Sequence, residues 1–199
     1  MISSLAPAFA EPILEAQSIF RTVMKAMSRP GAVQDLRCDL SPPAPLSAGA
    51  AAVALTLFDY ETPVWLDTSL AEADDVSRWL RFHTGASIVS DPQQAAFALI
   101  ADAVNAPDFM SFALGTPDYP DRSATLILQV HSLSGGHSMM LMGPGVDGVQ
   151  MMTANSLPDD FISRMTGNRA LFPRGVDVLL VTDHAVAAIP RSARVEGGA

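Results

Sequence analysis

One stretch, Ala124 to Gly145, constrains the fold of this chain more than any other. Its sequence is ATLILQVHSLSGGHSMMLMGPG, with an apolar run on either side of a Ser-Gly-Gly turn. The first run, Leu126–Val130, is too continuous for a solvated edge strand, so we expect a strand buried on both faces at the centre of the sheet. Glycine reaches positive φ without steric cost, so Gly135 and Gly136 should reverse the chain into a second strand, His137–Met142. The stretch therefore predicts a central hairpin.

Expected helices and strands alternate along most of the chain. Helices are predicted at 11–28, 46–58, 71–84, 105–114 and 157–166, and further strands at 62–67, 87–90, 97–101, 149–153, 176–182 and 185–189. Apolar strands that alternate with helices predict an α/β fold, a three-layer α/β/α domain, and a second hairpin at Asp183-His184 would make its sheet mixed. Helix 46–58 is apolar on most sides, so we expect it to be buried or to face another subunit.

Length and composition fit one well-filled domain. The chain has 199 residues, of which 49% are hydrophobic and 17% are charged. Domains commonly contain roughly 100 to 200 residues, so we expect a single domain over 1–199. Its ends, about 1–10 and 192–199, are expected to be less ordered.

The charge balance and the single cysteine limit the partners and the compartment. A net charge of -9 opposes nonspecific binding to nucleic acid or to an anionic membrane, although a local arginine pocket could still hold a small phosphate. Cys38 is alone, so no intramolecular disulfide can form. The N-terminus lacks a basic targeting region, and the apolar stretch 46–58 is shorter than the roughly 20 residues that cross a bilayer. We therefore expect a cytoplasmic protein without nucleic-acid or membrane partners.

The residue patterns indicate no metal site and no catalytic set. Histidines 83, 131, 137 and 184 lack the spacing of metal-binding motifs, and the glycine-rich segments match no nucleotide-binding motif. Phosphate recognition would need arginine. The candidates at the ends of regular elements are Arg81, Arg174 and Arg191, and solvated charges or salt bridges are the alternative for them. Methionines 139, 140, 142, 151 and 152 suit either a core or an interface.

A set of short motifs occurs in a fixed order along nearly the whole chain. They are Phe20-Arg21, Lys25–Ser28, Pro30-Gly31, Leu55–Leu57, Asp59, Thr62–Leu66, Leu80–Thr84, Gly115-Thr116, Ala124–Val130, Ser132–Gly136, Phe172-Pro173, Gly175, Ile189–Arg191 and Val195-Glu196. In this order they resemble the PhnH family, the H subunit of bacterial carbon–phosphorus lyase. The segment 105–114 and the Asp183-His184 turn fit the family pattern least, so nothing is transferred to them.

The resemblance implies a fold like that of the pyridoxal-phosphate-dependent transferases, self-association as a homodimer, and membership of a complex with other carbon–phosphorus lyase subunits. That complex supports formation of α-D-ribose 1-methylphosphonate 5-triphosphate from a nucleoside triphosphate and methylphosphonate. The family has no established catalytic residues on this subunit, so we expect an accessory or scaffold role in phosphonate catabolism, with no cofactor. The alternative is a stand-alone enzyme that binds a phosphorylated substrate. Within the matched motifs, Arg81, His83 and Arg191 are candidate contacts to a partner or a phosphate, and Arg174 lies beside one of them.

Overall fold

The computed structural model describes residues 6–198. Residues 1–5 and 199, parts of the ends predicted to be less ordered, lie outside the described residues. The helices are α1 (Pro12–Ser28), α2 (Ala48–Leu57), α3 (Thr68–Ala71), α4 (Asp74–Thr84) and α5 (Phe161–Ala170), with short 3₁₀ turns η1 (Pro92–Gln94), η2 (Ala103–Asn105) and η3 (Phe109–Ser111). The strands are β1 (Gln34–Asp35), β2 (Val64–Leu66), β3 (Ile88–Val89), β4 (Phe97–Ile100), β5 (Thr125–Gln129), β6 (His137–Met142), β7 (Gln150–Ala154), β8 (Asp177–Val181), β9 (Ala185–Ile189) and β10 (Arg194–Gly197).

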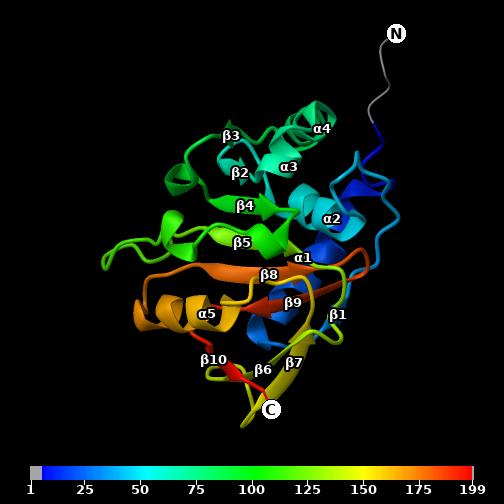
Figure 1. Cartoon of the computed structure of the whole chain (residues 1–199). Helices are drawn as coiled ribbons and strands as arrows, with labels where there is room; N and C mark the ends of the chain where they lie inside the picture. The colour runs from blue at the N-terminus through cyan, green and yellow to red at the C-terminus, as the bar shows by residue number, and fades with distance from the viewer. Residues whose placement is uncertain (1–5, 199) are drawn as a thin grey trace.

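The larger sheet has seven strands in the order β1-β9-β8-β5-β4-β2-β3 (Figure 1). Strands β3, β2, β4, β5 and β8 run parallel, whereas β9 is antiparallel to both of its neighbours. The predicted mixed α/β fold is therefore confirmed. Strand β5 lies at the centre, and its Leu126, Ile127 and Leu128 are fully buried, as the continuous apolar run predicted. The β8–β9 hairpin across Asp183-His184 is also confirmed.

The prediction of a central hairpin from Leu126 to Met142 is wrong. Strand β6 pairs with β7 and β10 in a separate three-stranded antiparallel sheet. Gly135 and Gly136 do adopt positive φ, at 72° and 74°, but the turn carries the chain away from β5. The reason is that β5 already has parallel partners on both sides, β4 and β8, so no edge is left for β6. Strand β10 was not predicted.

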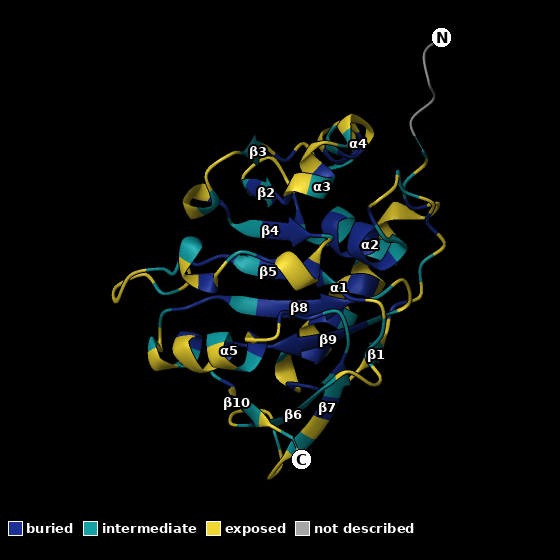
Figure 2. Cartoon of the chain, in the orientation of Figure 1, coloured by how far each residue is buried: buried dark blue, intermediate teal, exposed yellow. Residues whose placement is uncertain are grey.

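Both faces of the larger sheet are covered, because side chains alternate between the faces of each strand. Leu99, Ile127 and Leu179 pack in one apolar cluster with α1, α2 and α4. Ile100, Leu128 and other residues of alternate register pack in a second cluster with α5 and the small sheet. Figure 2 shows the middle strands almost wholly buried. The sheet thus separates two apolar cores.

Helix α2 is buried inside the chain, the first of the two placements that the sequence left open. Its residues Gly49 to Ala54 are all buried, and α1 and α4 pack against it. Gly49 allows this close approach, because a Cβ built there would lie 2.0 Å from the carbonyl oxygen of Thr182. The start of α2 therefore lies against the segment that follows β8, with no room for a side chain at position 49.

The predicted helix at 105–114 is wrong. Asn105 is instead the last residue of the 3₁₀ turn η2, and η3 forms separately after Pro107. Each turn is closed by an aspartate side chain that accepts from the backbone two or three residues later, Asp102 for η2 and Asp108 for η3. Such local hydrogen bonds compete with a continuous helix. Among the described helices, none is both long and apolar enough to cross a bilayer.

Candidate functional site

Four parallel strands, β2, β4, β5 and β8, end at the same edge of the larger sheet. In α/β proteins this carboxyl edge is the usual position of a binding crevice. A pocket of about 460 Å³ lies here. Its lining comes from the segments that follow the strands and from the start of α2, namely Pro45, Ser47, Ser69, Ala101, Asp102, Gln129, Val130, His131 and Asp183.

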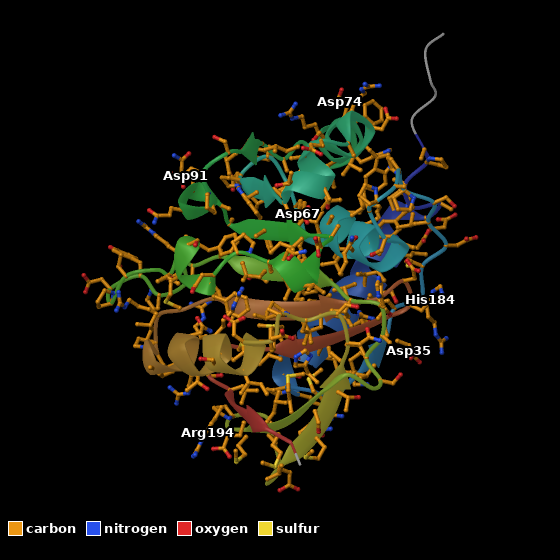
Figure 3. The ribbon with its side chains drawn as sticks, viewed as in Figure 1. Asp35, Asp67, Asp74, Asp91, His184 and Arg194 are labelled. Carbon is orange, nitrogen blue, oxygen red and sulfur yellow. The ribbon has the colours of Figure 1, made fainter. Side chains whose placement is uncertain are left out.

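Asp67 holds the strand ends together beside this pocket. It is 7% exposed and follows β2 directly, between α3 and β4 (Figure 3). One carboxylate oxygen, Oδ2, accepts the backbone N–H groups of Ala101 and Asp102 at 3.0 and 2.9 Å. The other, Oδ1, accepts from Leu70 N–H and Ser69 Oγ at 3.1 and 3.0 Å. The carboxylate therefore caps α3 and ties it to the end of β4.

The start of α2 forms the opposite wall. The backbone N–H of Ser47 donates to Gln129 Oε1 at 2.7 Å, and Gln129 Nε2 donates to the carbonyl of Pro45 at 3.1 Å. The next N–H, of Ala48, donates to Asp183 Oδ1 at 3.1 Å. A helix start leaves N–H groups without helical partners, and here strand-end side chains accept two of them. The polar groups of this wall are thus largely used in fixing the helix to the sheet.

A serine–histidine pair lies at the edge of the pocket. Ser156 Oγ lies 2.8 Å from His131 Nδ1, and Ser156 has a φ of 57°, the left-handed region that non-glycine residues rarely adopt. Hydrogen-bonded serine and histidine form the core of many nucleophilic sites, where a third group orients the histidine. Among the described residues no carboxylate is hydrogen-bonded to the other ring nitrogen of His131. The pair therefore lacks the orienting group of a catalytic triad.

Cys38 lies close to the same wall. Its Sγ is 3.7 Å from the carbonyl oxygen of Ala48 and 3.8 Å from that of Asp183. Burial raises the pKa of the Cys38 thiol, and the negative charges of Asp183, Glu15 and Asp39 raise it further. A thiol with a raised pKa is protonated at neutral pH, so Cys38 is a poor nucleophile.

The charge of the pocket lining determines which ligands it suits. Asp102 and Asp183 are the only charged residues among the nine that line it, and there is no arginine or lysine. Carboxylates repel phosphate, phosphonate and triphosphate groups at close range. The pocket therefore suits a neutral or cationic polar group and does not suit a phosphorylated substrate.

None of the four candidate contacts predicted from the sequence, Arg81, His83, Arg174 and Arg191, lines this pocket. Arg81 is exposed in the last turn of α4, and Arg174 is half-buried in the loop before β8. His83 Nε2 lies 3.1 Å from the carbonyl oxygen of Ala6, and its ring packs on Trp79 with 4.8 Å between centroids. The structure places Arg81 and His83 on one helix but does not bring the four candidates together.

Arg191 is not free to reach a partner. Its Nε and Nη2 donate to the carboxylate of Asp177, with Nη2–Oδ2 at 2.5 Å, and its Nη1 donates to the carbonyl of Pro120. The Arg191 and Asp177 side chains are only 15% and 14% exposed. Asp177 is the first residue of β8, so the pair lies at the edge of the sheet opposite to the pocket. The salt-bridge alternative accounts for Arg191.

The residues present do not fit pyridoxal phosphate. A Schiff base to this cofactor needs a lysine amine, and Lys25, the only lysine in the chain, is exposed in the last turn of α1 and does not line the pocket. Among the described residues no group of three His, Cys, Asp or Glu side chains is placed to hold a metal ion.

The sequence motifs did not indicate this pocket, although the sequence contains a signal for it. Asp67, Asp102 and Asp183 each follow a strand within two residues, and parallel strands bring their carboxyl ends to one edge. Spacing along the chain does not reveal residues that come together only through the order of the strands.

Comparison with known proteins identifies the family. A family model described as bacterial phosphonate metabolism protein (PhnH) matches residues 7–196. The chain belongs to the PhnH family. A relative from Rhizobium meliloti (strain 1021), named alpha-D-ribose 1-methylphosphonate 5-triphosphate synthase subunit PhnH, is 42% identical over 189 residues, which cover 95% of this chain and 94% of the relative. A more distant relative from Stutzerimonas stutzeri, named putative C-P lyase subunit protein HtxG, is 27% identical over 183 residues, covering 90% of this chain and 85% of the relative.

Membership of the PhnH family confirms the resemblance that the ordered motifs indicated. The match extends over both sheets and nearly all described elements, so it concerns the fold as a whole and not one shared segment.

Proposed function

We propose that this chain is an accessory or scaffold subunit of a carbon–phosphorus lyase complex in organic phosphonate catabolism. In this role it supports formation of α-D-ribose 1-methylphosphonate 5-triphosphate and binds other subunits of the complex. The observation that carries the proposal is the match to a synthase subunit over almost the full length of both chains.

The chemistry of the carboxyl-edge pocket supports a role without catalysis of its own. Its polar groups mostly hold α2, α3 and β4 in place, and its two carboxylates disfavour a triphosphate. The alternative, a stand-alone enzyme for a phosphorylated substrate, would need cations at the site. No observation in the described part of the chain favours that alternative.

Self-association, a cytoplasmic location and a transferase-like fold are parts of the same proposal. The net charge of -9 and the lone Cys38 support the location. The parallel core of five strands with helices on both faces supports the fold, which would be of the pyridoxal-phosphate-dependent transferase type without the cofactor. A homodimer of the isolated chain is supported by exposed apolar side chains elsewhere than on α2, because α2 packs within the chain.

Co-purification tests the proposed role. A tagged chain is expressed in its own bacterium under phosphate starvation, and the captured proteins are identified by mass. We expect other carbon–phosphorus lyase subunits in near-stoichiometric amounts. In parallel, the isolated chain is incubated with a nucleoside triphosphate and methylphosphonate. Turnover by the isolated chain, with no subunit captured, would favour the stand-alone enzyme.

A further inference from the structure

A second pocket lies at the opposite edge of the larger sheet, where the parallel strands begin. Its volume is about 270 Å³, and it is formed by η1 and by the segments that precede β2, β4 and β5. Figure 1 shows the loop before β5 extending outward from this edge. The lining residues are Pro63, Gln93, Gln94, Ala95, Ala96, Ala113, Asp121, Arg122 and Ser123. We call this cavity the amino-edge pocket.

The hydroxyl of Ser123 is buried without a partner. Ser123 is 9% exposed, and its Oγ makes no hydrogen bond within the described part of the chain. Buried polar groups in proteins are nearly always hydrogen-bonded, so an exception needs an explanation. Because Ser123 also lines the amino-edge pocket, a bound ligand can supply the missing partner.

Two opposite charges line the same pocket without pairing. Asp121 and Arg122 are adjacent and exposed, yet within residues 6–198 neither forms an ion pair with the other or with a third residue. The Arg122 guanidinium lies over the ring of Tyr119, 4.1 Å from its centroid. Gln93 donates its backbone N–H to Asp91, which leaves its side-chain amide available at the pocket. The pocket therefore offers a cation, an anion and neutral polar groups.

The polar groups of the two pockets have different tasks. At the carboxyl edge, Gln129 and Asp183 accept the hydrogen bonds that fix the start of α2 to the sheet. At the amino edge, the charged side chains of Asp121 and Arg122 hold no element in place, so they are free to bind a ligand.

The loop that carries these charges is nevertheless fixed. Arg191 Nη1 donates to the carbonyl of Pro120, and the backbone N–H of Arg122 donates to the carbonyl of Tyr119 at 3.2 Å. A binding site that is already ordered loses less affinity to the ordering of its own groups.

We propose that the amino-edge pocket binds a small zwitterion, a molecule with a primary ammonium group and an oxyanion on a short chain. Arg122 pairs with the oxyanion, because a guanidinium donates two parallel hydrogen bonds to such a group. Asp121 accepts from the ammonium group, and the Ser123 hydroxyl adds a further hydrogen bond. A ligand with one charge would leave one of the two charged side chains without a partner. The oxyanion is a carboxylate or a phosphonate, since both fit the guanidinium fork.

The size of the pocket limits the ligand further. Pockets for drug-sized ligands have volumes of roughly 300–1,000 Å³, and the amino-edge pocket lies below this range. It therefore suits a ligand of the size of a short amino acid and does not suit a nucleoside triphosphate. This inference goes beyond the role in the lyase complex and does not depend on it.

Calorimetric titration of the isolated chain tests the site with two pairs of probes. β-Alanine and 2-aminoethylphosphonate carry both charges, whereas propionate and ethylamine carry one charge each. We expect a zwitterion to bind, and propionate and ethylamine to bind at least about ten-fold more weakly, because each lacks one charged hydrogen-bonding group. Tighter binding of β-alanine would identify the oxyanion as a carboxylate, and tighter binding of 2-aminoethylphosphonate would identify it as a phosphonate.

Three variants test the assigned side chains. Arg122→Ala and Asp121→Asn should each weaken binding of the zwitterion by about ten-fold or more, and should keep the melting temperature, because both side chains are exposed. Ser123→Ala should also weaken binding without lowering the melting temperature, because the hydroxyl has no partner in the free chain. Asp118→Asn is the matched control, since Asp118 is exposed in the same loop but does not line the pocket. It should bind as wild type does.

Several results would overturn the proposal. Neither zwitterion binding at millimolar concentration would show that the pocket is not such a site. Equal affinity for propionate and β-alanine would show that Asp121 takes no part, and unchanged binding by Arg122→Ala would place the ligand elsewhere. Early melting of Ser123→Ala would show that the hydroxyl is used within the fold, and would remove the observation on which the site rests. None of these results changes the capture of lyase subunits, so this proposal can fail separately from the proposed function.

Discussion

At the scale of single residues, Arg191 illustrates how partners inside the chain determine what an arginine can do. Two nitrogens of its guanidinium donate hydrogen bonds to the Asp177 carboxylate, and the third donates to the carbonyl of Pro120. The Arg191 backbone N–H also donates to Asp177 Oδ1 at 2.8 Å. The interaction joins the end of β9 to the start of β8 and to the loop before β5. It is therefore a structural link between three segments.

The Arg191 pair leads to a prediction about stability. Arg191→Ala leaves the Asp177 carboxylate without its main partner in a site that is mostly buried, and it should lower the free energy of unfolding by about 2–4 kcal/mol. Urea unfolding of the purified variant measures the change. Arg194→Ala is the control, since that side chain is 67% exposed and should cost less than about 1 kcal/mol. A change below 1 kcal/mol for Arg191→Ala would show that the pair contributes little.

Cys38 gives a prediction about pH. The pKa of its thiol is raised by burial and by Asp183, so the thiolate should form only above the pH at which an ordinary thiol ionises. The rate of alkylation by iodoacetamide should begin to increase at a higher pH in the folded chain than in the same chain unfolded in urea. The raised pKa also predicts a loss of stability as pH increases above the ordinary thiol range, because only the unfolded chain then ionises. Equal profiles for the folded and unfolded chains would contradict this.

Lys25 gives a prediction about the cofactor. Because the single lysine lies outside the pocket, on a solvent-exposed part of α1, the purified chain should not form an aldimine with pyridoxal phosphate. The absorbance spectrum is recorded after incubation with the cofactor and dialysis. A visible aldimine band that disappears in Lys25→Ala would show that the transferase-like fold had kept a cofactor site.

At the scale of elements, tight packing of α2 against β8 depends on one glycine. A Cβ at Gly49 would lie 2.0 Å from the carbonyl oxygen of Thr182. Backbone atoms in a packed core cannot move aside as the end of a flexible side chain can. We predict that Gly49→Ala lowers the free energy of unfolding by about 3 kcal/mol. Gly167 is the matched control, because it is also helical but has no atom within 4 Å of its Cβ position. Gly167→Ala should instead stabilise the chain by about 0.5–1 kcal/mol. Destabilisation of similar size in both variants would contradict this account.

The same scale explains which elements could be predicted from the sequence. Helix α1 and strands β5 and β8 were predicted well, because an amphipathic period or a long apolar run leaves few alternatives. The segment 105–114 was predicted as one helix because its apolar residues dominate the pattern, whereas Asp102 and Asp108 close separate turns. Strand β10, at 194–197, could not be predicted, because a strand of four residues with a single buried apolar side chain forms only through its pairing with β6.

The candidate site could not be predicted from local sequence patterns in the way that these elements could. Arg81, Arg174 and Arg191 were selected because each ends an element, but a position along the chain does not say which edge of the sheet that end occupies. The pocket depends on the order β8-β5-β4-β2, which sets four strand ends side by side. Local sequence patterns do not predict long-range strand pairing of this kind, and they do not predict the ion pair between Arg191 and Asp177. The family resemblance, in contrast, was visible because it depends on the order of motifs alone.

At the scale of the whole molecule, replacing the exposed Arg81 of α4 can distinguish an effect on assembly from an effect on folding. Arg81 lies in the last turn of the helix and is exposed, so Arg81→Ala should cost the isolated fold only about 0–1 kcal/mol. In an assembled interface, truncating a desolvated charge can cost roughly 2–5 kcal/mol of binding.

We therefore predict that Arg81→Ala keeps a near-normal melting temperature but captures markedly less of the other lyase subunits, and supports growth on methylphosphonate poorly. Arg78→Ala is the control on the same helix, since Arg78 is 58% exposed and pairs with Asp75 at 3.3 Å within the chain. It should behave as wild type in both assays. Normal capture and growth with Arg81→Ala would mean that this arginine is dispensable, whereas early unfolding would mean that it acts within the fold; either result would remove Arg81 from the partner surface.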